Sequence, residues 1–168
     1  MECGGSASAF QTDSKAEALP PHSIEMIEIR TDGMDIDTIH RYLSEESYWA
    51  KGIPRDVCER AIASSLCFGA FDGGMQVGFA RAVTDYATFA YLADVFVLPS
   101  HRGRGISKQI LQAVMTHPGL QGLRRWHLVT RDAHSLYAQF GFAPLDAPER
   151  HMAIVVKNPY PPLSAGRM

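Results

Sequence analysis

The chain has 168 residues, 46% of them hydrophobic, which suits one compact domain with a buried core better than two domains. Its 16 basic and 18 acidic side chains give a formal charge of -2, which disfavours nucleic acid and anionic membranes as partners. Cys3, Cys58 and Cys67 form no CxxC pair, so we expect neither a disulfide framework nor a metal site, and a reducing, cytoplasmic location.

The first 23 residues are small and polar and end in prolines, as is typical of a loose extension rather than a cleaved signal. No later stretch approaches the roughly 18 consecutive apolar residues of a membrane-spanning helix, so we expect a soluble protein. We therefore predict an extension over 1–23, a single domain over 24–157 and a proline-rich tail over 158–168.

The domain begins with an alternating apolar pattern from Ile24, which predicts a strand that ends near Asp32. Asp35 is placed to cap a helix whose apolar residues recur at helical spacing as far as Leu43. The stretch SYWAKGIP interrupts this pattern, and a second helix is predicted over about 55–65.

Three strand-like runs follow between 66 and 99, separated by an Asp-Gly-Gly turn at 72–74 and by polar residues at 84–85. This spacing predicts an antiparallel meander. Beyond it, a helix with one apolar face is predicted from Ile106 until His117.

The C-terminal part of the domain holds three short elements. RRWHLVT predicts a strand, and DAHSLYAQFGF predicts a short helix that Asp132 caps and that Gly141 ends in a left-handed conformation. HMAIVVK predicts a strand that closes the sheet. The order of elements predicts an α+β fold of mixed α/β type, with a mostly antiparallel central sheet flanked by helices.

The stretch HRGRGIS, residues 101–107, joins the fourth predicted strand to the third long helix. A helix N-terminus leaves backbone N–H groups unpaired and carries about half a positive charge. Glycines let this backbone approach an anion closely and two arginines neutralise it, so the turn predicts a receptor for a diphosphate. Lys108 stands where a dinucleotide fingerprint needs glycine or alanine, and a Walker sequence is absent. The alternative is an exposed helix entry with solvated arginines.

Together with DVFVLP and LYAQFGF, the turn RGRGIS resembles the GNAT acyl-CoA N-acyltransferases over about residues 24–157. The family pattern is Gln or Arg, two residues, Gly, one residue, then Gly or Ala; Arg102, Gly105 and Ser107 match it, with serine in the last small position. The resemblance implies acetyl-CoA as cosubstrate, its diphosphate on the turn amides and its pantetheine arm along the preceding strand. It places these residues at the coenzyme: Phe96, Val97, Leu98, Arg102, Gly103, Arg104, Gly105, Ile106 and Ser107.

The same resemblance implies two catalytic groups besides a backbone N–H near Phe96 for the oxyanion. Tyr137 lies where family members place the tyrosine that protonates the departing coenzyme A sulfur; its alternative role is packing. Asp94 interrupts an apolar strand, where a carboxylate relays the amine proton in related enzymes. Its alternative role is an ion pair with a neighbour such as Arg81 or Arg131.

Three histidines are weaker candidates for proton transfer, because none has a visible partner in the sequence: His101, His127 and His134. For the acceptor we expect the segment between the first two helices and the meander to supply the contacts, with core packing as the alternative for each residue. The candidate residues are Tyr48, Trp49, Asp85 and Tyr86.

The resulting hypothesis is an N-acetyltransferase that moves the acetyl group of acetyl-CoA to a primary amine of a small molecule, by direct attack in a ternary complex. Homodimers occur in the family, so a homodimer is a possible state. The alternative is a non-catalytic acyl-CoA-binding sensor or partner subunit, because a fold alone does not establish a reaction.

Overall fold

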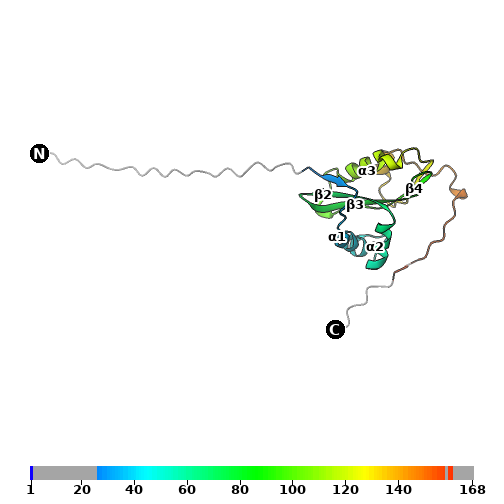
Figure 1. Ribbon diagram of the computed structural model, residues 1–168, viewed down its shortest axis with the longest axis horizontal. Helices are drawn as coiled ribbons and strands as arrows, with labels where there is room; N and C mark the ends of the chain where they lie inside the picture. The colour runs from blue at the N-terminus through cyan, green and yellow to red at the C-terminus, as the bar shows by residue number, and fades with distance from the viewer. Residues whose placement is uncertain (2–25, 158, 161–168) are drawn as a thin grey trace, which may run out of the picture.

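The computed structural model describes Met1, residues 26–157 and residues 159–160, and its body is built around one sheet (Figure 1). The sheet has the order β1-β2-β3-β4-β5; the first four strands are antiparallel neighbours and β5 joins β4 in parallel. The strands are β1 (Glu28–Arg30), β2 (Leu66–Asp72), β3 (Met75–Thr84), β4 (Phe89–Val97) and β5 (Arg125–His127). The predicted α+β fold with a mostly antiparallel sheet is confirmed.

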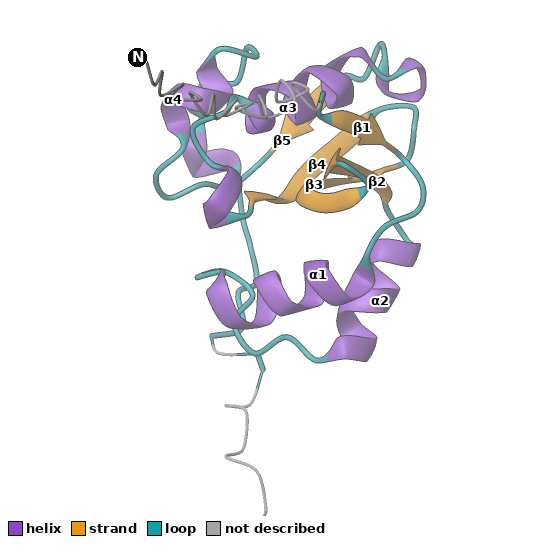
Figure 2. Ribbon diagram, turned by 90° about the vertical axis from the view of Figure 1, so that its left-hand side faces the viewer, coloured by secondary structure: helices purple, strands orange, loops and turns teal. Residues whose placement is uncertain are grey.

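Helices cover both faces of this sheet (Figure 2). On one face lie α1 (Ile36–Arg41), which continues as a π-helical turn over Tyr42–Glu46, and α2 (Arg55–Ala63). On the other lie α3 (Ile106–Thr116) and α4 (His134–Ala138). Each face buries its own hydrophobic cluster, so the sheet is covered by apolar contacts on both sides. No helix in the described ranges is long and apolar enough to cross a membrane.

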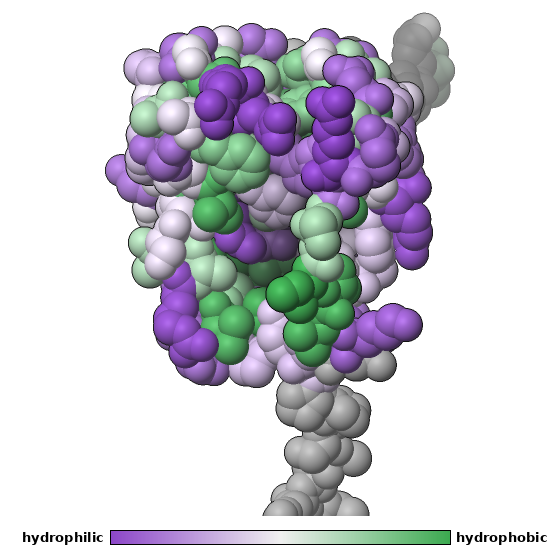
Figure 3. Space-filling model, turned by 90° about the vertical axis from the view of Figure 1, so that its right-hand side faces the viewer, coloured by the Kyte–Doolittle hydropathy of each residue, from purple (hydrophilic) through white to green (hydrophobic). Residues whose placement is uncertain are grey.

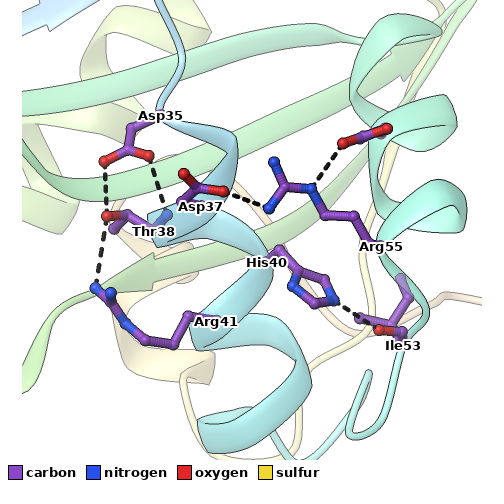
Figure 4. Close-up of polar contacts among 8 residues, drawn as sticks. Asp35, Asp37, Thr38, His40, Arg41, Ile53 and Arg55 are labelled. Carbon is purple, nitrogen blue, oxygen red and sulfur yellow. Dashed lines mark hydrogen bonds and ion pairs between the residues drawn. The ribbon is translucent and has the colours of Figure 1, made fainter.

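The N-terminus of α1 is capped as predicted (Figure 4). Asp35 Oδ1 accepts a hydrogen bond from the Thr38 backbone N–H at 3.1 Å, and Asp35 Oδ2 accepts one from the Thr38 hydroxyl at 2.7 Å. Farther along, Arg55 of α2 contacts Asp37, and His40 Nε2 lies 3.0 Å from the Ile53 carbonyl oxygen. These contacts tie α1 to the start of α2 and to the end of the connecting segment 47–54.

Two predicted turns depend on glycine conformation. The β2–β3 hairpin turns at Gly73 and Gly74, whose φ values of 56° and 85° lie in the left-handed region that glycine adopts at little cost. The entry to α3 is likewise left-handed at Gly105, with φ 74°. Beyond that entry, Ile110 and Leu111 are fully buried against the sheet, so the apolar face predicted for this helix is confirmed.

Three local predictions need correction. Asp132 does not cap α4: Ala133 occupies the N-cap position, and no side chain makes a capping hydrogen bond to this helix. The Thr130 hydroxyl oxygen accepts a hydrogen bond from the Ala133 N–H at 3.1 Å, just before the helix. The predicted first strand is reduced to Glu28–Arg30, and the start of its range lies outside the described residues. The segment HMAIVVK, residues 151–157, is not a strand. Its strand-forming composition does not suffice without a neighbouring strand, and it pairs with none among the described residues. The predicted extension over 1–23 and most of the tail also lie outside the described residues.

Candidate active site

The site begins where β4 and β5 separate. Their pairing ends at Tyr91 opposite His127, whereas β4 continues to Val97. The edge of β4 beyond Tyr91 therefore has no neighbouring strand among the described residues on its β5 side. A free strand edge presents backbone donors and acceptors that an extended ligand can use.

Two adjoining clefts follow this edge. The first, of about 540 Å³, runs from the turn before α3 to α4, and the second, of about 500 Å³, continues along residues 91–95 of β4. Residues common to both linings mark the junction: Tyr48, Trp49, Val95, Arg131, Asp132, Ala133 and Tyr137. The arrangement offers one ligand space on each side of the junction, so two reactants can meet there.

The turn before α3 presents backbone donors to the first cleft. Within the described part of the chain, the amides from Gly103 to Ser107 have no hydrogen-bond acceptor. A side-chain Cβ at Gly103 or Gly105 would meet no atom within 4 Å, so the backbone here faces open space. Unpaired amides at the start of an eleven-residue helix suit an anion, and the residues therefore fit a diphosphate.

The arginines of the turn are not simply solvated. Arg104 pairs with Asp72 Oδ2 at 2.5 Å while its side chain stays 44% exposed, and it lines neither cleft. Arg102 does line the first cleft, where it donates to the Val97 carbonyl oxygen at 3.1 Å and to the Tyr42 hydroxyl at 3.1 Å. Both arginines are thus held by contacts within the protein, and of the two only Arg102 lines the cleft; neutralisation of an anion by both stays a prediction.

Tyr137 lies on α4 at the junction of the clefts. Its ring packs edge-to-face on Phe142 with centroids 5.9 Å apart, and burial raises the pKa of its phenol to about 12, with smaller effects from Tyr48 and Asp132. The phenol is therefore protonated at neutral pH. A protonated phenol at the junction can donate its proton to a leaving group there. The contact with Phe142 shows that Tyr137 also has the packing role considered as its alternative.

Asp94 occupies a bulge of β4 with φ 52°, a left-handed conformation that Asp tolerates better than most residues. Its side chain is 11% exposed and faces the second cleft. Oδ2 accepts a hydrogen bond from Arg81 Nε at 2.5 Å, and Oδ1 accepts one from Trp49 Nε1 at 2.8 Å. Of the two ion-pair partners considered, Arg81 is the one present, whereas Arg131 lies 3.3 Å from Asp132.

The expected acceptor residues divide into two groups. Tyr48 and Trp49 line both clefts, and the Tyr48 ring lies 3.8 Å below the Arg131 guanidinium. Asp85 and Tyr86 line neither cleft. They form the β3–β4 turn, where the Asp85 carboxylate accepts a hydrogen bond from the Thr88 hydroxyl and others from the backbone N–H groups of Ala87, Thr88 and Phe89. These bonds, the Thr88 hydroxyl first, hold the pKa of Asp85 far below its ordinary value. Their contacts account for a turn rather than a pocket.

The remaining candidates are spread around the first cleft. Phe96, Val97, Ile106 and Ser107 line it, whereas Leu98 does not and donates its N–H to the Val77 carbonyl oxygen at 2.8 Å. His101 lines it too, with Nε2 3.6 Å from Asp72 Oδ2. His127 stacks on Tyr91 at the β5 edge, and His134 lines neither cleft.

Sequence reasoning missed several cleft residues from distant elements. The Tyr42 ring stacks on Phe96 with centroids 3.9 Å apart, and Glu46 follows it on the same π-helical turn. Ala133 and Leu136 complete the α4 side of the cleft. The irregular sequence after Leu43 signalled a break in the helix, but no pattern in it pointed toward β4. In the described ranges, no group of three or more His, Cys, Asp or Glu side chains is placed to hold a metal.

Comparisons with known proteins show which sequences and folds this chain is similar to. A sequence profile described as an acetyltransferase (GNAT) domain matches residues 63–144. A protein of Gibberella zeae to which an acetyltransferase activity is ascribed is 34% identical over 128 residues, which are 63% of this chain and 71% of that protein.

Solved structures are similar over most of the described chain. A protein of Xanthomonas campestris pv. campestris that is ascribed to the GNAT family is 55% identical, with a TM-score of 0.79 over 80% of this chain and 96% of that chain. A Clostridium acetobutylicum protein to which an acetyltransferase activity is ascribed was solved with acetyl-CoA. It shares the fold at 15% identity, with a TM-score of 0.55 over 79% of this chain and 97% of that chain. From the profile, the relatives and the fold together, the chain belongs to the GNAT family of acetyltransferases.

Proposed function

We propose that this protein transfers the acetyl group of acetyl-CoA to a primary amine of a small molecule, by direct attack while both reactants are bound. The observation that carries the proposal is the row of acceptor-free amides from Gly103 to Ser107, set at one end of a cleft that reaches Tyr137 at the other. Coenzyme A is a diphosphate joined to a long amide arm and a sulfur, so its parts match the turn, the strand edge and the junction in that order.

The first cleft takes the coenzyme. The turn amides bind the diphosphate at the positive end of the α3 dipole. The free edge of β4, with Phe96 and Val97 lining the cleft, pairs with the two amides of the pantetheine arm as an added strand would. A Clostridium acetobutylicum protein with the same fold was solved with acetyl-CoA, which supports acetyl-CoA as the cosubstrate in this proposal.

The transfer needs a donor at the sulfur and support for the oxyanion. The amine nitrogen attacks the thioester carbonyl carbon, so a C–N bond forms while the C–S bond breaks and the electron pair stays on sulfur. Tyr137 supplies a proton to that sulfur and later regains one from solvent, because its phenol is protonated at neutral pH. A backbone N–H of β4 near Phe96 stabilises the oxyanion in this scheme.

The second cleft takes the amine. Asp94 faces it, but both carboxylate oxygens already accept hydrogen bonds, one from Arg81 and one from Trp49, so the protein holds this side chain in place. We therefore assign Asp94 a positioning role and let solvent accept the amine proton. Aromatic side chains line part of this cleft, and they favour an amine with an aromatic or apolar body: Tyr48, Trp49, Tyr91, Tyr137 and Tyr160.

Coenzyme A release tests the proposal. Acetyl-CoA and a panel of primary amines, comprising arylalkylamines, polyamines, amino sugars and a lysine peptide, are followed for free thiol production. We expect turnover that saturates in both reactants and is fastest with arylalkylamines. Saturable binding of acetyl-CoA without thiol release by any amine would instead support the binding-only sensor or partner subunit.

A further inference from the structure

The junction of the two clefts carries opposite charges on two neighbouring residues. Arg131 and Asp132 lie between β5 and α4 and line both clefts, and their side chains are 65% and 63% exposed. Arg131 Nη2 lies 3.3 Å from Asp132 Oδ2, and an exposed ion pair of this kind contributes little free energy. Neither residue takes part in the transfer described above. A ligand with charges of its own can therefore replace either partner at little cost.

Arg131 is held in place while most of its hydrogen-bond donors stay open. Its guanidinium carbon lies 3.8 Å from the centroid of the Tyr48 ring, and the Tyr48 hydroxyl oxygen accepts a hydrogen bond from the Arg131 backbone N–H at 3.2 Å. A guanidinium has five N–H donors in one plane. Within the described residues, the one acceptor that this guanidinium contacts is Asp132. The side chain thus presents a positioned set of donors at the junction.

The other two arginines that line the clefts are engaged differently. Arg81 is 19% exposed, and it donates to Asp94 Oδ2 at 2.5 Å and to the Ser65 hydroxyl at 3.2 Å. Arg102 lies at the turn, where the diphosphate is placed. The thioester end of the coenzyme carries no charge, so the coenzyme does not need a cation at the junction. The Arg131 charge is therefore available to the acceptor.

Apolar surface adjoins these charges. Aromatic side chains line the second cleft beside them, and they include Tyr91 of β4 and Tyr160 near the far end of the chain. Figure 3 shows the side of the body on which β4 lies in Figure 1: the surface is hollowed there, and hydrophilic and apolar side chains meet around the hollow. A plain amine would bring only a positive charge next to Arg131, whereas a zwitterion complements both Arg131 and Asp132.

We propose that the acceptor is an α-amino acid with an aromatic or apolar side chain, whose carboxylate pairs with Arg131; this inference rests on the proposed acetyl transfer. A carboxylate can accept two parallel hydrogen bonds from a guanidinium. It must be attached close to the amine, because Arg131 and Tyr137 share the junction at which the amine meets the thioester. The ammonium group approaches Asp132 and loses a proton to solvent, and the neutral amine then attacks the thioester carbon as described above. The products are an N-acetyl amino acid and coenzyme A.

Matched acceptors test the role of the carboxylate. Phenylalanine is compared with 2-phenylethylamine and phenylalaninamide, and leucine with 3-methylbutylamine, by free thiol production from acetyl-CoA. We expect kcat/KM to be roughly 10- to 100-fold higher for the amino acids, as the loss of a charged hydrogen bond implies. Phenylalaninamide has a less basic amine than phenylalanine, so a larger share of neutral amine cannot explain a preference for phenylalanine. Equal or faster acetylation of the acceptors without a carboxylate would overturn the inference and leave the acetyl transfer standing.

Variants at position 131 assign the preference to this residue. Arg131→Gln should remove the preference through a higher KM for phenylalanine, and Arg131→Lys, which keeps the charge but not the two parallel bonds, should restore part of it. Arg60→Gln is the matched control: Arg60 is 69% exposed, pairs with Asp56 at 2.7 Å and lines neither cleft, so this variant keeps the parental preference. A preference that survives Arg131→Gln would contradict the assignment.

Calorimetry separates this inference from the proposed function. Phenylalanine and leucine are titrated into the parent protein with excess coenzyme A, which has no acetyl group to transfer. We expect saturable binding that Arg131→Gln weakens about tenfold or more. Such binding without thiol release from acetyl-CoA would remove the acetyl transfer and leave the amino-acid site standing. A parent that binds coenzyme A but neither amino acid would overturn the site.

Discussion

Replacing Gly105 with alanine probes the contact between the turn backbone and the diphosphate. An added Cβ meets no atom within 4 Å, so the cost to the fold is that of the left-handed φ of 74° alone, about 1–2 kcal/mol. For a protein of this size that corresponds to a fall in Tm of roughly 2–8 °C. The methyl group points into the cleft and keeps an anion from the amides; losing one charged hydrogen bond costs about 1.5–3 kcal/mol, or roughly 10- to 150-fold in Kd.

Gly122 provides a matched control for this change. Its φ is 73°, a Cβ there also meets nothing within 4 Å, and it lines neither cleft. Gly122→Ala should lower Tm by the same amount as Gly105→Ala and leave the Kd for coenzyme A, measured by calorimetry, at the parental value. Equal coenzyme A affinity in both variants would refute the assignment of the diphosphate to this turn.

Four further predictions concern side chains. Tyr137→Phe keeps the ring packing and lowers kcat about 100-fold or more, with the Kd for acetyl-CoA changed less than about twofold; unchanged kcat would remove Tyr137 from the reaction. Because its folded pKa of about 12 lies above the unfolded value near 10, Tyr137 contributes full stability below about pH 10, and chemical denaturation should show that contribution lost as pH rises toward 12. In Asp94→Asn, asparagine can adopt the conformation of the bulge, but the partly exposed ion pair with Arg81 is lost. We expect the free energy of unfolding in urea to fall by about 2–3 kcal/mol and the pH profile of kcat to stay in place. A profile displaced to higher pH would make Asp94 the base. In a Cys3→Ser variant, Cys58 and Cys67 should react with a thiol reagent at pH 8 only after unfolding, since burial raises both pKa values, and fast labelling of the native protein would contradict this.

Much of the fold followed from local pattern. The Asp-Gly-Gly turn, the Asp35 cap and the apolar face of α3 each need only neighbouring residues, and the structure has all three. The cap of α4 was misplaced because the helix begins one residue later than Asp132 would require, and this start depends on the path of the chain after β5. HMAIVVK has the composition of a strand, but composition does not say which sheet edge, of which chain, pairs with it.

The parts of the candidate site that lie within a single segment of the chain could be predicted from the sequence. The glycines of the turn and the position of Tyr137 were visible in the sequence. The bulge at Asp94 and the stacking of Tyr42 on Phe96 depend on tertiary packing, for which alternation of apolar residues gives no signal. The partners of Arg104 and Arg102 were missed for the same reason, because Asp72 and Tyr42 lie on other elements.

The central claim is that the turn and the β4 edge align a thioester with Tyr137. A crystal structure with acetyl-CoA tests it most directly, through the position of the diphosphate and the distance from the Tyr137 hydroxyl to the sulfur. We predict the diphosphate on the amides of Gly103 to Ser107 and a hydroxyl–sulfur separation within hydrogen-bonding reach. A coenzyme bound elsewhere, or a sulfur turned away from Tyr137, would contradict the account.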